Sequence, residues 1–381
     1  MVGGVDSLPS APLTAFEDWY ADTDAFRPAA DCADQWCSAA ADAGAGYVVI
    51  VAKHHDGVAN FPSRSPSRQL ADGRDLVAEV AAAAARHGLE LGIYFSLSDW
   101  GHEDYPAWNP SMAPYSFFSY PRPEPETWAR FRAHLLDQID QLLDHDPRYI
   151  WFDGGWERNP DEWGATEIEQ LIRSRCPGVL INDRLPGSGI DVTTPEQLIP
   201  AQALDGRWEA CMTMNRSWGW VPTDHDYSSA AELVWTLTEV VGRGGNLLVN
   251  VSPSADGSLP VEQSERLAVV GEWMRRNADA VVGAGAGLEP WQWYGPSTSR
   301  DDVVHLVATM APQGRVVVRG LRTRQVASVE VLDTGRALSF RTRISALDEV
   351  LGGDPVGEVI IDVPDEVVDD VATVLAIRFR P

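Results

Sequence analysis

The sequence is short of lysine above all. Lys53 is the only lysine among 30 basic residues, which stand against 56 acidic residues and leave a formal net charge of −26 at pH 7. A chain with this charge repels phosphate backbones and anionic lipids, so it is not expected to bind nucleic acid or a membrane surface. The acidic, lysine-poor composition fits either a G+C-rich coding sequence or a salt-tolerant host.

Long apolar runs and paired cysteines are also missing. No stretch of about eighteen apolar residues occurs, and residues 1–14 lack the positive segment and apolar core of a secretion signal. We therefore expect no membrane span and a cytoplasmic location. The four cysteines, Cys32, Cys37, Cys176 and Cys211, contain no C-x-x-C pair. They predict free, partly buried thiols rather than a zinc site or a disulfide framework.

Residues 149–156 read YIWFDGGW. The first four form an apolar run of strand length, and the carboxylate of Asp153 follows it directly. Its aromatic and branched residues favour a buried strand, and a charge directly after them avoids the cost of burial where the strand emerges. In a (β/α)8 barrel, catalytic residues gather at the C-terminal ends of strands. Asp153 is therefore the candidate catalytic residue, with a carboxylate that caps a loop or helix as the alternative.

Further strand-like stretches end in polar or ionisable residues: YVVIVAKHHDG (47–57), LELGIYFSLSDW (89–100), VLINDR (179–184) and NLLVNVSP (246–253). Together with YIWFDGGW, they resemble glycoside hydrolase family 29, the α-L-fucosidases, whose barrel carries such motifs in this order. The resemblance covers about residues 15 to 280. It implies a (β/α)8-type TIM barrel at residues 15–284 and a C-terminal β-sandwich at residues 285–381, after an irregular segment at residues 1–14.

The alternation of strand and helix patterns agrees with an α/β barrel. Residues 76–88, LVAEVAAAAARHG, predict a helix, because Arg86 and His87 suit the dipole of its last turn and Gly88 is a typical stop. After about residue 285 the pattern changes to short apolar stretches between turns, which predicts antiparallel strands.

The first strand of the family, with the form F-G-x-F-x-H-W-G and a sugar-binding histidine, has no counterpart upstream of Asp18 and Trp19. These two residues occupy the place of a Glu-Trp pair that lines the family's sugar pocket, so the resemblance implies that they bind substrate. A barrel that lacks a strand exposes two sheet edges. We therefore expect a start that lies further upstream, an irregular replacement formed by residues 1–14, or a degenerate relative.

Hydrolysis of a glycoside with retention needs two carboxyl groups roughly 5 Å apart. Asp153 is the predicted nucleophile, as the resemblance also implies. Two glutamates are candidates for the acid/base residue: Glu196 in TTPEQ and Glu209 in RWEACMTM. The resemblance to a family branch with a T-P-E motif favours Glu196. Trp208 gives Glu209 the apolar neighbour that suits a general acid, although a buried structural glutamate is equally ordinary.

The resemblance also implies that the sugar is bound by His54, His55, Tyr94 and Arg184. Adjacent histidines on a strand point to opposite faces, so both can serve one site only if the segment bends after them. A core histidine is the alternative for this pair, and a structural salt bridge is the alternative for Arg184. Trp151, two residues before Asp153, points to the same side of the strand and is the predicted aromatic contact for an apolar sugar face.

The sequence therefore predicts a retaining exo-α-L-fucosidase for small-molecule or oligosaccharide substrates with terminal fucose, working without metal or organic cofactor. The T-P-E motif points to the branch that acts on branched α-1,3/1,4-linked fucose. The alternatives are an inactive fucose-binding relative and a related barrel glycosidase for another neutral sugar. The sequence leaves open whether the chain forms a homo-oligomer.

Overall fold

The computed structural model describes residues 25–70, 72–107, 121–187 and 189–380. The chain divides into two compact units. The first contains the residues up to Thr194 together with Asn215–Tyr227 and Asn250–Ser264, and the second contains Pro195–Met214, Ser228–Val249 and Glu265–Pro381. The sequence predicts a single boundary near residue 285, whereas these two units alternate along the chain. The boundary between barrel and sandwich stays a prediction.

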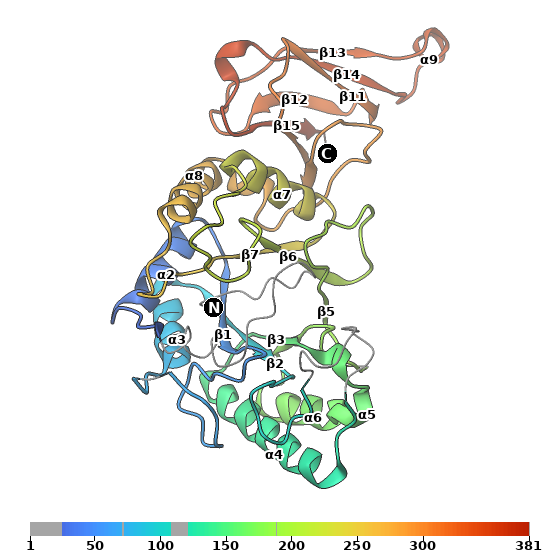
Figure 1. The fold of residues 1–381 in the computed structure, drawn as a ribbon. Helices are drawn as coiled ribbons and strands as arrows, with labels where there is room; N and C mark the ends of the chain where they lie inside the picture. Colours follow the sequence, from blue (N-terminus) through green and yellow to red (C-terminus); the bar gives the residue numbers. More distant parts are fainter. Residues whose placement is uncertain (1–24, 71, 108–120, 188, 381) are drawn as a thin grey trace. The chain divides into compact units, whose positions relative to one another are not determined.

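The first unit is built on a parallel sheet in which the strand order follows the sequence, β1-β2-β3-β4. Helices connect its strands, and two of them, α4 and α6, pack against each other beside the sheet (Figure 1). The elements of this unit are α2 (Cys32–Asp42), β1 (Tyr47–Lys53), α3 (Leu76–His87), β2 (Glu90–Ser96), α4 (Pro125–Leu142), η1 (Leu143–His145), β3 (Tyr149–Asp153), η2 (Gly155–Glu157), α5 (Pro160–Trp163), α6 (Ala165–Arg175), β4 (Leu180–Ile181) and β5 (Val192–Thr193).

The central strand β3 is buried along its whole length. Phe152 packs edge-on against Phe95 of β2 and belongs to a core that also contains Leu135 of α4 and Ile168 of α6. A strand covered on both faces explains why Tyr149–Asp153 reads as a continuous apolar run up to its terminal carboxylate.

The helix predicted at residues 76–88 is confirmed, with α3 ending one residue before Gly88. Asp75 caps its start by accepting a hydrogen bond from the backbone N–H of Ala78 at 2.8 Å. Gly88 ends it with φ 71°, a left-handed conformation that glycine adopts without strain.

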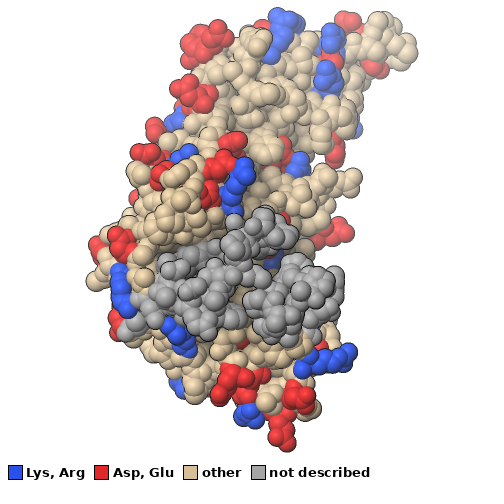
Figure 2. All heavy atoms as spheres, in the orientation of Figure 1, with Lys and Arg blue, Asp and Glu red and all other residues tan. Residues whose placement is uncertain are grey.

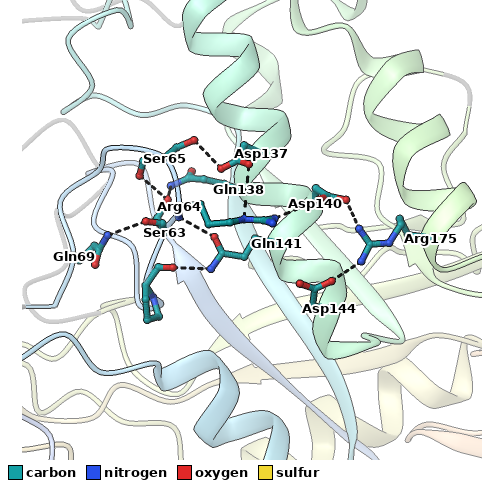
Figure 3. A network of polar contacts seen from close by, with 11 residues as sticks. Ser63, Arg64, Ser65, Gln69, Asp137, Gln138, Asp140, Gln141, Asp144 and Arg175 are labelled. Carbon is teal, nitrogen blue, oxygen red and sulfur yellow. Dashed lines mark hydrogen bonds and ion pairs between the residues drawn. The ribbon is translucent and has the colours of Figure 1, made fainter.

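The segment after β1 is tied to α4 by polar contacts (Figure 3). The side chain of Gln141 accepts from the backbone N–H of Arg64 at 2.9 Å and donates to the carbonyl of Pro62 at 2.6 Å. The Ser65 hydroxyl donates to Asp137 at 2.8 Å. These bonds fix a loop that carries no regular structure of its own.

The second unit ends in two antiparallel sheets with the orders β12-β15-β10-β9-β8 and β11-β14-β13. Both sheets contribute to one core that includes Leu306, Val318, Ile361 and Leu375, which is the arrangement of a β-sandwich (Figure 1). The elements from residue 207 onward are β6 (Arg207–Thr213), α7 (Ala230–Gly242), β7 (Asn246–Asn250), α8 (Val261–Asn277), η3 (Ala278–Ala280), β8 (Gly285–Ala286), β9 (Ser297–Arg300), β10 (Val303–Ala308), β11 (Arg315–Arg322), β12 (Val326–Val331), β13 (Phe340–Arg343), α9 (Ala346–Leu351), β14 (Val356–Asp362), η4 (Asp365–Val367) and β15 (Thr373–Phe379).

Closure of the parallel strands into a complete barrel stays a prediction, and so does the replacement of its first strand by residues 1–14, which lie outside the described part of the chain. Among the described residues, no helix combines the length and apolar character needed to cross a membrane.

Candidate active site

Asp153 is the last residue of β3, and both of its carboxylate oxygens meet donors. The hydroxyl of Tyr94 donates to Oδ2 at 2.6 Å, and Nη1 of Arg184 donates to Oδ1 at 3.0 Å. Nε2 of His55 lies 3.4 Å from Oδ2. The side chain of Asp153 is only 12% exposed, so these groups replace the water that would otherwise solvate it.

This environment lowers the pKa of Asp153 below its ordinary value. Burial alone raises the pKa, because it disfavours the charged form. The hydrogen bond and charge of His55, the charge of Arg184 and the hydrogen bond from Tyr94 outweigh burial and favour the carboxylate. An ionised carboxylate at the end of a strand can act as a nucleophile at neutral pH.

The parallel register brings these groups together. Tyr94 of β2 lies opposite Trp151, and Ser96 lies opposite Asp153. His55 comes from the turn directly after β1, and Arg184 from the segment after β4. The C-terminal ends of parallel strands lie at one edge of the sheet, so residues far apart in sequence gather there.

His54 and His55 both lie near the carboxylate of Asp153, because the chain bends immediately after β1. The N–H of Gly57 donates to the carbonyl of His54 at 3.0 Å, and Gly57 has φ 78°. The two imidazole rings are 4.4 Å apart, and His54 stacks on Tyr94 at 5.7 Å. Burial and the charge of His55 hold the pKa of His54 well below its usual range, so His54 is neutral.

Trp151 is 3% exposed and packs inside the site. Its ring stacks on Tyr94 at 5.4 Å, and the guanidinium of Arg184 lies 5.0 Å from its centroid. Trp151 thereby supports two residues that contact Asp153. The direct sugar contact predicted for Trp151 stays a prediction.

The sequence did not single out Trp156 and Glu157, which follow Asp153 on η2. Trp156 is 46% exposed, with Arg184 over its ring at 5.7 Å and His55 against its edge at 6.1 Å. Glu157 is buried and accepts hydrogen bonds from Nε1 of Trp100, at 3.0 Å, and from the hydroxyl of Tyr105. Burial raises the pKa of Glu157. No spacing in the sequence distinguishes Glu157 from the other acidic residues, so only the fold identifies it.

The two candidates for the acid/base residue belong to the second unit and differ in exposure. Glu196 is exposed and pairs with Cys211 in an isolated parallel bridge. Glu209 lies inside β6 and is 2% exposed. The acid/base roles of both glutamates stay predictions.

Asp18 and Trp19 lie outside the described residues, so the sugar-binding role predicted for them stays a prediction.

All four cysteines are buried, and no two of them form a disulfide. Within the described ranges, no group of three His, Cys, Asp or Glu side chains is placed to hold a metal ion.

Comparisons with known proteins agree on one family. The profile of the family described as alpha-L-fucosidase matches residues 15–279. An α-L-fucosidase from Dictyostelium discoideum is 28% identical over 309 residues, which cover 75% of this chain and 64% of that protein. The chain therefore spans less than two thirds of the length of this relative.

Solved structures are similar over nearly the whole chain. Alpha-L-fucosidase isoenzyme 1 from Paenibacillus thiaminolyticus aligns with a TM-score of 0.83 and 30% identity, covering 96% of this chain and 90% of that chain. A Bacteroides thetaiotaomicron α-L-fucosidase, solved as a trapped covalent intermediate with 2-fluoro-fucosyl fluoride, aligns with a TM-score of 0.81 and 24% identity. That alignment covers 97% of this chain and 86% of that chain.

Proposed function

Because the chain belongs to the α-L-fucosidase family of glycoside hydrolases, glycoside hydrolase family 29, we propose that it hydrolyses terminal α-L-fucosyl residues of small-molecule or oligosaccharide substrates. The observation that carries this proposal is the environment of Asp153. Its carboxylate lies at the end of a parallel strand, with donors from Tyr94, His55 and Arg184 around it. Such a carboxylate is suited to attack a sugar carbon and to leave it again.

The mechanism that fits this carboxylate is double displacement with retention. Asp153 attacks the anomeric carbon, the bond from that carbon to the leaving oxygen breaks, and a second carboxyl group donates its proton to that oxygen. The second group, now ionised, then takes a proton from a water molecule whose oxygen attacks the same carbon. The ester bond breaks, fucose is released, and Asp153 returns to a carboxylate. The covalent intermediate trapped in the Bacteroides thetaiotaomicron relative supports this path.

Glu196 is the proposed acid/base residue, and Glu209 is the alternative. An acid/base residue must meet both the leaving oxygen and incoming water, which suits the exposed Glu196 better than Glu209, buried inside a strand. A (β/α)8 barrel with a C-terminal β-sandwich is the proposed architecture. It is supported by the parallel order β1-β2-β3-β4 with connecting helices and by the two antiparallel sheets that follow.

Replacement of Asp153 by alanine tests the nucleophile. We expect release of the chromophore from an aryl α-L-fucoside to fall about a thousandfold or more, because the covalent step is lost. The matched control is Asp161→Ala, which removes an exposed aspartate eight residues along the chain, on α5, and should retain wild-type activity. Equal rates for wild type and Asp153→Ala, with fucose still bound, would overturn the proposal in favour of a fucose-binding protein. Release from a different aryl glycoside in a panel would instead assign another neutral sugar.

Azide identifies the two carboxyl groups by the stereochemistry of its product. In Asp153→Ala, azide takes the place of the nucleophile, so we expect the inverted β-fucosyl azide. In Glu196→Ala, azide attacks the glycosyl-enzyme in place of activated water, so we expect the retained α-fucosyl azide. Formation of the α-azide by Glu209→Ala instead of Glu196→Ala would transfer the acid/base role to Glu209. NMR of the isolated azide distinguishes the two anomers.

A further inference from the structure

The only lysine of the chain lies buried beside the histidines of the candidate active site. Lys53 is the last residue of β1 and is 0% exposed. Its Nζ donates to Oδ2 of Asp99 at 3.3 Å and lies 4.5 Å from the centroid of the Phe95 ring. Asp99 is 2% exposed. Lys53 and Asp99 therefore form an ion pair that is closed to solvent.

This pair contacts both ends of the turn that carries the two histidines, residues 54–58, which we call the histidine turn. Lys53 precedes the turn and forms an isolated antiparallel bridge with Ala59 at its base. A Cβ atom at Gly57 would lie 2.0 Å from Oδ1 of Asp99, so this carboxylate packs directly against the backbone of the turn. Asp99 thus meets the residue before the histidines with one oxygen and a residue after them with the other.

Hydrogen bonds within the histidine turn give the turn its shape. The N–H of Gly57 donates to the carbonyl of His54 at 3.0 Å, and the N–H of Val58 donates to Oδ1 of Asp56 at 2.8 Å. These bonds join near neighbours in the sequence, so they fix the conformation of the turn but not its position against β2 and β3. Contacts with the segment after β2 fix that position, and Asp99 lies in this segment.

The residues on both sides of Asp99 contact His55. Oγ of Ser98 lies 2.8 Å from Nδ1 of the ring, and Oγ of Ser96 lies 2.6 Å from the same nitrogen. The N–H of Trp100 donates to the carbonyl of His55 at 2.7 Å, and its indole stacks on the ring at 4.9 Å. A displacement of Asp99 would therefore move groups that orient this ring.

The ring held in this way faces Asp153, because Nε2 of His55 lies 3.4 Å from Oδ2 of that carboxylate. We propose that Lys53 and Asp99 are positioning residues whose buried contact holds the histidine turn in place and so keeps His55 beside Asp153. Both side chains are closed to solvent, so they act on the reaction only through the groups they place. A misplacement of about 1 Å can cost about a hundredfold in rate. This inference rests on the proposed function, in which Asp153 attacks the sugar.

Substitution Lys53→Met tests the pair, because methionine keeps the length of the side chain but cannot donate to Asp99. Urea unfolding first identifies a temperature at which every variant is folded. There we expect kcat/KM for an aryl α-L-fucoside to fall about tenfold to a hundredfold. In a His55→Ala background, the same substitution should lower kcat/KM by less than about threefold, because the ring that it displaces is absent. A purely structural pair would give the same loss in both backgrounds.

The matched control is Arg276→Met in the second unit. It also replaces a cation that binds carboxylates, those of Asp333 and Asp369, and it should leave kcat/KM unchanged in both backgrounds. If Lys53→Met does not fold, Lys53→Met/Asp99→Asn takes its place, because it leaves no buried charge without a partner and still lacks the ammonium. The expected losses are the same for this double variant.

Crystal structures of the wild type and Lys53→Met measure the position of His55 without reference to activity. We expect Nε2 of His55 within about 3.5 Å of Oδ2 of Asp153 in the wild type and further away in the variant. An unmoved ring, an undiminished kcat/KM, or a loss above about threefold in the His55→Ala background would overturn the inference. A wild-type protein that releases no fucose would instead contradict the proposed function, while the two structures would still show whether the pair positions His55.

Discussion

At the scale of single residues, the site depends on how Asp153 stays charged although its side chain is only 12% exposed. Burial raises the pKa of this carboxyl, and three donors, from β2 and from the segments after β1 and β4, lower it by a larger amount. Tyr94 makes the shortest of these contacts, at 2.6 Å. The hydroxyl of Tyr94 is neutral, so its removal weakens the stabilisation of the carboxylate without changing the number of charges in the site.

Substitution Tyr94→Phe should raise the pKa of Asp153 toward its ordinary value. The acid limb of kcat/KM against pH then moves to higher pH, because the carboxylate takes up its proton earlier as pH falls. At pH 7 we expect a loss of about tenfold, the usual effect of one hydrogen bond to a charged group. Tyr149→Phe, at the opposite end of β3, is the control and should leave the profile unchanged. An acid limb that does not move in Tyr94→Phe would show that its hydroxyl does not stabilise the charge of Asp153.

At the scale of secondary-structure elements, the position of Asp153 depends on how β3 is held beside the short strand β4. Asn182 follows β4, and its side chain continues the pairing where the backbone ladder stops. Its Oδ1 accepts from the N–H of Phe152 at 2.8 Å, and its Nδ2 donates to the carbonyl of Phe152 at 2.9 Å. Asn182 is fully buried. One side chain therefore pairs both backbone groups of the residue before Asp153.

Substitution Asn182→Ala leaves the N–H and the carbonyl of Phe152 buried without these partners. We expect the free energy of unfolding to fall by about 2–4 kcal/mol, because two buried polar groups lose hydrogen bonds. Urea unfolding measures this change. The control is Gln141→Ala, which also removes two hydrogen bonds to backbone, but at the surface of α4 (Figure 3). Gln141→Ala should lower the free energy of unfolding by less than about 1 kcal/mol. Equal decreases in the two variants would show that the burial of Asn182 does not increase the effect of losing its hydrogen bonds.

At the scale of the whole molecule, acidic residues outnumber basic ones and leave a net charge of −26. Figure 2 shows carboxylates and guanidinium groups spread over the drawn face. Many arginines bind carboxylates, as Arg276 does with both Asp333 and Asp369, but exposed pairs of this kind contribute little stability. The unpaired excess of negative charge repels itself and destabilises the compact state.

Salt should therefore stabilise this protein by screening that repulsion. We expect Tm at pH 7 to rise between about 0.01 and 0.3 M NaCl, a range over which the Debye length falls from about 30 Å to below 8 Å. At a pH near the isoelectric point of about 4.5, the rise should largely disappear because the net charge is close to zero. Differential scanning calorimetry measures both series. A Tm that is independent of salt at pH 7 would mean that local ion pairs already balance the excess charge.

The sequence by itself determined where β3 and α3 lie, that the cysteines carry no framework, and which strand ends carry polar residues. Periodicity, helix stops and apolar runs are local, so they can be read without the fold. Only the tertiary structure decided that Trp151 packs behind Tyr94, that Glu157 binds Trp100, and that two serines meet the far nitrogen of His55. These contacts join segments up to 57 residues apart. They depend on strand register and side-chain rotamers, which the fold selects and a local pattern does not specify.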